Sequence, residues 1–158
     1  IKDQFGLSSA YNGIFKAIIA VVTLLANGTI CVWLQRKTNI NLSFLPVMLC
    51  CTVSLGAILF FDSLLPFVLV DILFFTFNAV RLPLLQNMTA MRSTPESSNA
   101  VMGFYQAMGS MGGIFGALFA GLIYDINPLL PFILAFGSFA VGSTVTLLYT
   151  KKYRREQA

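Results

Sequence analysis

The charged residues of this chain are few and clustered, and the apolar stretches between them are about 20 residues long, the length that crosses a bilayer. Hydrophobic residues make up 57% of the 158 residues and charged residues 10%, whereas a soluble domain carries about a quarter charged residues. A soluble protein would have to bury nearly every residue of such a chain. The sequence therefore predicts an all-α membrane protein, a bundle of five transmembrane helices in one membrane domain over residues 1–158.

Polar clusters and prolines set the limits of these helices. Pro46 falls in a first turn, where proline is tolerated, whereas Pro83 removes a backbone hydrogen bond and should bend its helix. Thr94, Pro95 and Glu96 together predict a helix start, with an N-cap, a proline at the first position and an acid in the first turn. The expected helices cover residues 8–34, 42–61, 64–90, 95–125 and 128–150, and a basic, frayed C-terminal tail covers 151–158.

The fourth stretch, from Gly103 to Asp125, has glycines at helical spacing. A helix in lipid is held by its own hydrogen bonds, and a missing side chain lets another backbone approach closely. We therefore expect this helix to be clamped inside the bundle. The glycines expected to serve helix packing are Gly109, Gly112, Gly113, Gly116 and Gly121.

Polar residues line one face of three of the helices. In the first, Asn12, Lys16, Thr23 and Asn27 follow spacings of four, seven and four, which place them on one face. The third helix carries Asp71 and Asn78 seven apart with Arg81 at the edge of their face, and the fourth carries Gln106. Because the second and fifth helices lack such a stripe, we expect them to face lipid. The predicted substrate or ion cavity is lined by Lys16, Asp71, Asn12, Asn27, Asn78, Gln106 and Arg81.

Lys16, Asp71 and Arg81 each have an alternative interpretation. A charge facing lipid is costly, so such residues usually face water or a partner. A buried carboxyl such as Asp71 is suited to loading and releasing a proton. Alternatively, Asp71 forms a fixed ion pair with Lys16 or Arg81, Arg81 snorkels to the cytoplasmic face, and the neutral polar residues only make interhelical hydrogen bonds.

The sequence lacks the residues that several classes of function require. The chain has no histidine, no close carboxylate pair, no nucleotide-binding loop and no metal-ligand cluster, so we expect no enzyme, cofactor or metal. Cys31, Cys50 and Cys51 lie in or beside apolar runs and are interpreted as core residues. The net charge of +4 does not predict nucleic-acid binding, because the basic residues fall in the segments that flank lipid.

The basic residues also predict an orientation. Arg36, Lys37 and Arg92, together with the basic tail 151–158, fall on one side of the expected helices. Cytoplasmic loops of membrane proteins are enriched in lysine and arginine. We therefore expect a multi-pass protein of the plasma membrane with its N-terminus outside and its C-terminus in the cytoplasm, as five crossings require.

Three motifs occur in an order typical of one family of carriers. FGLSSAYNGIF begins the first helix; GTICVWLQRK runs from Gly28 to the basic pair Arg36 and Lys37; and the fourth helix ends in a glycine-rich run with G-x-x-x-D. Together they resemble the last five helices of the twelve-helix major facilitator superfamily, in particular its drug-efflux-like proton antiporters. GTICVWLQRK resembles the second copy of that family's cytoplasmic loop signature, with Val32 at the usual aspartate position.

The resemblance implies an incomplete C-terminal half of a secondary transporter that moves a small organic solute by alternating access, either coupled to protons or as a uniporter. Its partners would be the bilayer, the missing N-terminal half of the carrier and a small-molecule substrate. In that family the helices equivalent to the first, third and fourth line the cavity. The alternative is a non-transporting membrane module that binds a partner through its glycine-rich helix. The chain begins at Ile1, and we expect it to be a piece of a longer protein.

Overall fold

The computed structural model describes residues 9–61 and 63–157, except the side chains of Ser9, Ala10 and Asn12, and is helical throughout its elements. Five helices are long and apolar enough to cross a membrane, as the sequence predicts. The first is one rod of three parts, α2 (Ser9–Ala26), the π-helical turn η1 (Asn27–Cys31) and α3 (Val32–Lys37). The other four are α4 (Ile40–Ile58), α5 (Leu64–Ala90), α6 (Ser98–Tyr124) and α7 (Leu130–Gln157).

Several helix ends differ from the prediction, among them the end of α7 and the start of α6. The helix α7 continues through the basic tail to Gln157, because lysine, arginine and glutamate favour helix once the apolar run has ended. The helix α6 begins at Ser98 rather than at Pro95. The segment before it is a turn in which the Thr94 N–H donates to Ser97 Oγ at 3.0 Å and the Ser97 N–H donates to the Thr94 carbonyl at 3.1 Å.

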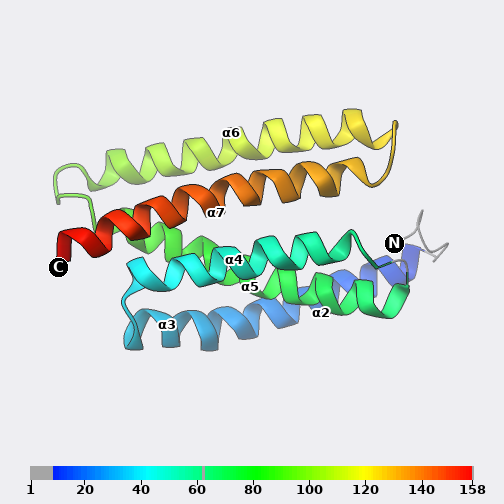
Figure 1. Cartoon of the computed structure of the whole chain (residues 1–158), viewed down its shortest axis with the longest axis horizontal. Helices are drawn as coiled ribbons and strands as arrows, with labels where there is room; N and C mark the ends of the chain where they lie inside the picture. Colours follow the sequence, from blue (N-terminus) through cyan, green and yellow to red (C-terminus); the bar gives the residue numbers. More distant parts are fainter. Residues whose placement is uncertain (1–8, 62, 158) are drawn as a thin grey trace.

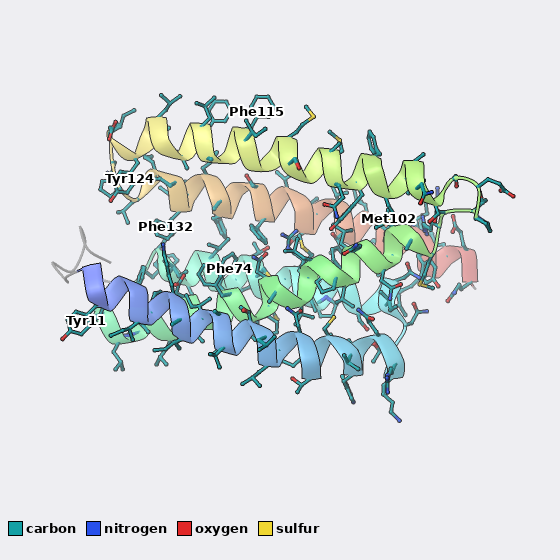
Figure 2. The ribbon with its side chains drawn as sticks, turned by 180° about the vertical axis from the view of Figure 1, so that it is seen from behind. Tyr11, Phe74, Met102, Phe115, Tyr124 and Phe132 are labelled. Carbon is teal, nitrogen blue, oxygen red and sulfur yellow. The ribbon has the colours of Figure 1, made fainter. Side chains whose placement is uncertain are left out.

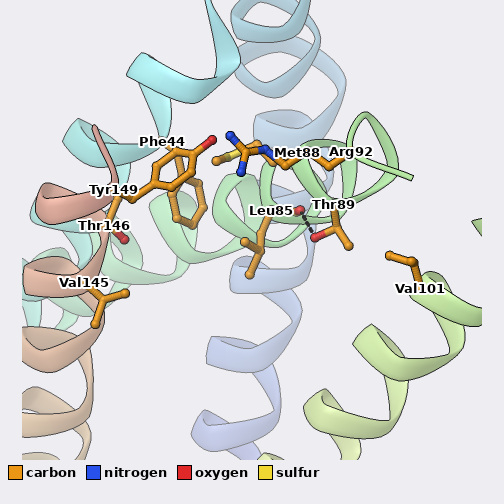
Figure 3. Close-up of a pocket in the computed structure, with 9 residues that line it drawn as sticks. All are labelled: Phe44, Leu85, Met88, Thr89, Arg92, Val101, Val145, Thr146 and Tyr149. Carbon is orange, nitrogen blue, oxygen red and sulfur yellow. Dashed lines mark hydrogen bonds between the residues drawn. The ribbon is translucent and has the colours of Figure 1, made fainter. Parts of the chain in front are cut away.

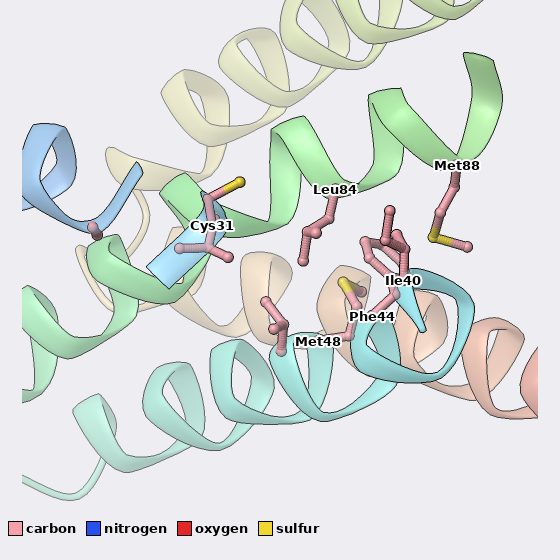
Figure 4. Close-up of a cluster of buried hydrophobic side chains, with 9 residues drawn as sticks. Cys31, Ile40, Phe44, Met48, Leu84 and Met88 are labelled. Atoms are coloured by element: carbon pink, nitrogen blue, oxygen red, sulfur yellow. The ribbon is translucent and has the colours of Figure 1, made fainter. Parts of the chain in front are cut away.

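The most extensive helix contacts join α4 to α5 and to α7, and α5 in turn contacts α2 and α6 (Figure 1). Val80, Leu84, Phe44 and Met48 belong to the larger buried cluster between α4 and α5 (Figure 4). Because α4 has the largest buried share of the five, the expectation that the second helix mainly faces lipid is wrong. Its sequence is mostly apolar and has no polar stripe, which fits a helix surrounded by other helices as well as one surrounded by lipid.

The glycine-rich helix is not clamped by the rest of the chain. No residue of α6 is buried, and a Cβ built on any of the glycines predicted to pack would have no neighbouring atom within 4 Å among the described residues. The close approaches lie elsewhere: a Cβ on Gly56 of α4 would come within 3.0 Å of the Phe136 ring of α7, and one on Gly142 within 3.0 Å of Met48. The expected clamping is therefore wrong within the described part of the chain, where the smooth face of α6 is open.

The start of α2 and the end of α7 lie at opposite ends of the bundle (Figure 1). The end that holds the C-terminus also holds the last turn of α3, with Arg36 and Lys37, and the turn between α5 and α6, with Arg92. The basic residues of the described chain are thus gathered at one end of the helices, except Lys16 and Arg81 within the spans. We call this the basic end.

Candidate functional site

The helices with predicted polar stripes are neighbours in space. In the view from behind, α2 and α6 run along opposite sides of α5 (Figure 2), and both contact it. The residues expected to line a cavity therefore belong to three adjoining helices, with α5 in the middle.

Asp71 is the most enclosed of these residues, with 9% of its surface exposed. It lies seven residues after the start of α5 at Leu64, which places it about 10 Å along the helix. No ion pair joins it to Lys16 or Arg81 in the described part of the chain, so the fixed pair considered from the sequence is not formed. Lys16 itself is exposed. The fold thus brings a carboxyl group into the bundle without a described basic partner.

Arg81 is half-buried and turned toward the bundle. Its Nε donates to Asn78 Oδ1 at 3.0 Å, and its guanidinium carbon lies 5.1 Å from the centre of the Phe139 ring on α7. A guanidinium over an aromatic face is stabilised by the ring quadrupole. These contacts hold the cation about 14 Å from the end of α5 at Ala90, so it does not snorkel to the basic end.

The stripes on α2 and α6 are open. Lys16, Asn27 and Gln106 are exposed, and the side chain of Asn12 lies outside the described residues. An exposed face of this kind can adjoin either lipid or a water-filled cavity, since both lie outside the chain. What the fold does establish is that no described residue covers them.

The residues of the predicted loop signature lie in helix rather than in a loop. Gly28 is part of η1, and Arg36 and Lys37 form the last turn of α3, so only residues 38 and 39 connect to α4. A π-helical turn inserts an extra residue into a helix and is frequent at functional sites. Here it begins at Asn27, a predicted cavity residue.

A polar contact between α4 and α7 escaped the sequence analysis. The hydroxyl oxygens of Thr52 and Ser143 lie 2.7 Å apart, and the Thr52 hydroxyl also reaches the Phe139 carbonyl at 3.3 Å. Single hydroxyl residues in apolar runs carry little signal, because serine and threonine also satisfy themselves on their own helix, as Thr76 does on Ile72. The nearby Gly142 offered the only hint that α7 is packed closely there.

The arrangement places charge and polarity at separate depths of the bundle. No cluster of histidine, cysteine or carboxylate residues suited to a metal occurs among the described residues. Asp71 and Arg81 are ten residues apart on α5, about 15 Å along its axis. They can therefore act on a solute or ion at two depths of the bundle, not as one pair.

No protein-family model, curated protein or solved structure matches this chain. The likeness to the major facilitator superfamily therefore depends on the sequence motifs alone.

Proposed function

We propose that this chain is the C-terminal part of a secondary transporter. The complete transporter would move a small organic solute across the plasma membrane by alternating access. The main supporting observation is Asp71, a carboxyl group enclosed in a spanning helix without an ion pair to Lys16 or Arg81. An ionisable group at that depth is expensive and usually functional. A carboxyl group without an ion pair to a described residue can take up and release a proton as its surroundings change, which suits proton-coupled efflux.

The position of α5 between α2 and α6 supports the same proposal. No described residue covers the polar stripes of α2 and α6, and α5 between them carries Asp71 and Arg81 enclosed in the bundle. In a carrier built from two halves, a second half facing those surfaces would enclose the solute near the bilayer midplane. The N-terminus would lie outside and the basic end in the cytoplasm.

The test is solute flux by the full-length protein in proteoliposomes, with Asp71→Asn and Lys16→Ala compared with the wild type. Asp71→Asn should abolish the dependence of flux on a proton gradient, and Lys16→Ala should weaken flux or solute affinity. Asp125→Asn is the matched control, because Asp125 is an exposed acid at the end of α6. If neither Asp71→Asn nor Lys16→Ala changes flux or its pH dependence, this assignment is wrong.

The open face of α6 favours a second candidate, a non-transporting module that binds a partner helix. Small residues let helix backbones approach closely in lipid, and nothing described lies within 4 Å of a Cβ on Gly112 or Gly116. Two results together would favour this function. A partner should co-purify with the wild type and with Gly103→Val but not with Gly112→Val, and the full-length protein should show no gradient-driven flux. Gly103 is a control because it lies on the same helix outside the predicted packing set.

A further inference from the structure

A cavity of about 370 Å³ lies between α5, α6 and α7 at the basic end of the bundle (Figure 3). Its walls are mostly apolar: Leu85 and Met88 come from α5, Val101 from α6, Val145 from α7, and Phe44 reaches in from α4. The volume falls within the roughly 300–1,000 Å³ of small-molecule pockets. The chamber is therefore large enough for part of an apolar ligand, and none of its residues belongs to the cavity proposed for transport.

One cation is fixed at the mouth of this chamber. The guanidinium carbon of Arg92 lies 4.9 Å from the centre of the Tyr149 ring. Tyr149 is held in turn by its hydroxyl, which donates to Asn41 Oδ1 at 2.7 Å. In Figure 3 the guanidinium group points along the upper edge of the chamber toward Tyr149. The cation is thus directed to one place instead of moving freely in solvent.

A smaller hollow of about 120 Å³ adjoins the chamber and shares Arg92 and Tyr149 with it. It adds Lys152, Tyr153 and Glu156 from the last turns of α7. Glu156 lies 3.9 Å from Lys152, but both side chains are mostly exposed, and an exposed pair of this kind is weak. Arg92 forms no ion pair with a described acid, so it is free to bind an anion.

We propose that the chamber and the hollow together bind one anionic phospholipid from the surrounding leaflet. An acyl chain would fill the apolar chamber, and the phosphate group would lie against Arg92 and Lys152. The order of the two spaces carries the argument: the apolar one lies toward the middle of the bundle and the cationic one at its end, as the tail and headgroup of a lipid are arranged. Basic pockets between spanning helices at the cytoplasmic side are suited to anionic headgroups, and arginine binds phosphate in two-pronged geometry.

Native mass spectrometry of the detergent-purified full-length protein tests this proposal. The protein is titrated with dioleoyl phosphatidylglycerol, dioleoyl phosphatidylcholine and inorganic phosphate. Arg92→Gln removes the directed cation. Arg36→Gln is its matched control, because Arg36 is an exposed arginine at the same end that lines neither space. Val145→Trp fills the chamber from a side chain that is 60% exposed, so it should leave the fold intact.

We expect the phosphatidylglycerol to be retained in preference to the phosphatidylcholine, and Arg92→Gln to weaken its binding by roughly fivefold. Arg36→Gln should leave that affinity unchanged, and Val145→Trp should weaken both lipids. Equal retention of the two lipids, or equal losses in Arg92→Gln and Arg36→Gln, would overturn the proposal. The proposal would also be overturned if inorganic phosphate displaced bound phosphatidylglycerol as effectively as added phosphatidylglycerol does. That result would indicate a site for the headgroup without a place for the acyl chain.

Discussion

At the scale of single residues, α5 carries two charged side chains with different surroundings. Arg81 is held by Asn78 and by the face of Phe139, whereas Asp71 is enclosed without an ion pair to a described residue. A carboxyl group that forms no ion pair with a described residue can be neutralised at little cost. The charge of a group that is stacked and hydrogen-bonded cannot be removed without losing those contacts. The two residues should therefore respond in opposite ways to substitution.

Asp71→Asn should leave the melting temperature of the purified protein unchanged or raise it, because it removes a charge from a low-dielectric site and breaks no described ion pair. Leu84→Ala provides the scale, since truncating a fully buried leucine costs about 2–5 kcal/mol and Leu84 has 0% of its surface exposed. A fall in melting temperature as large as that of Leu84→Ala would mean that Asp71 is a structural residue.

Arg81 and Phe139 should show energetic coupling. A double-mutant cycle with Arg81→Met and Phe139→Leu should give a coupling of about 1–2 kcal/mol in unfolding, as expected for a partly desolvated cation on an aromatic face. The loss of the Asn78 hydrogen bond is common to both Arg81→Met variants and cancels. The same cycle with Phe119→Leu, an exposed ring on α6, is the control. A coupling of zero with Phe139 would contradict the stacked geometry.

At the scale of helices, the sequence predicted which segments form helices long and apolar enough to cross a membrane, but not which of them pack together. Bilayer and protein interior are equally apolar, so hydropathy does not distinguish the central α4 from a helix in lipid. The recurrent glycines of α6 indicate a smooth face, but a smooth face gives no information on whether its partner belongs to the same chain. The polar spacing in α2, α5 and α6 was more informative, because it picked out three helices that are neighbours.

The ends of the helices were also predicted poorly from the sequence. Hydropathy marks where lipid ends, and α7 continues past that point because its polar tail residues are good helix formers, with Lys152 and Glu156 one turn apart. The turn at Thr94 and Ser97 was mistaken for the first turn of α6, since Pro95 suits both structures. The π-helical turn η1 has no recognised sequence signal, so it was not predicted.

Glycine substitutions should distinguish the closely packed helix α4 from the open helix α6. Gly56→Val should destabilise the protein by about 1–3 kcal/mol, the usual cost of overpacking, because its new side chain would meet the Phe136 ring at 3.0 Å or less. Gly112→Val makes the same local change in a helix with no described neighbour within 4 Å. It should stay within about 0.5 kcal/mol of the wild type. Equal effects in thermal unfolding of the two variants would refute the packing described for α4 and α7.

At the scale of the whole molecule, the bundle has a basic end and an end at which α2 begins (Figure 1). If the basic end is cytoplasmic, an epitope tag after Ala158 should be accessible to antibody only in permeabilised cells. A tag placed before Ile1 in this chain should be accessible in intact cells. Access to both tags on one side would contradict five crossings.

The central claim is that the open polar faces of α2 and α6, on either side of α5, adjoin a water-filled space, whereas the outer apolar faces of α4 and α7 lie in lipid. The most direct test introduces single cysteines by Asn27→Cys, Gln106→Cys, Leu49→Cys and Val141→Cys into the full-length protein in membranes. All four side chains are exposed in the fold, so only their surroundings differ. Labelling by a small hydrophilic maleimide is then mapped by mass spectrometry.

We predict fast labelling at positions 27 and 106 and slow labelling at positions 49 and 141, because a thiolate forms in water but not among acyl chains. The native Cys31 and Cys51 are buried and should stay largely unlabelled in every sample, which provides an internal control for folding. Slow labelling at positions 27 and 106, matching that at 49 and 141, would place the polar faces in lipid and contradict the account.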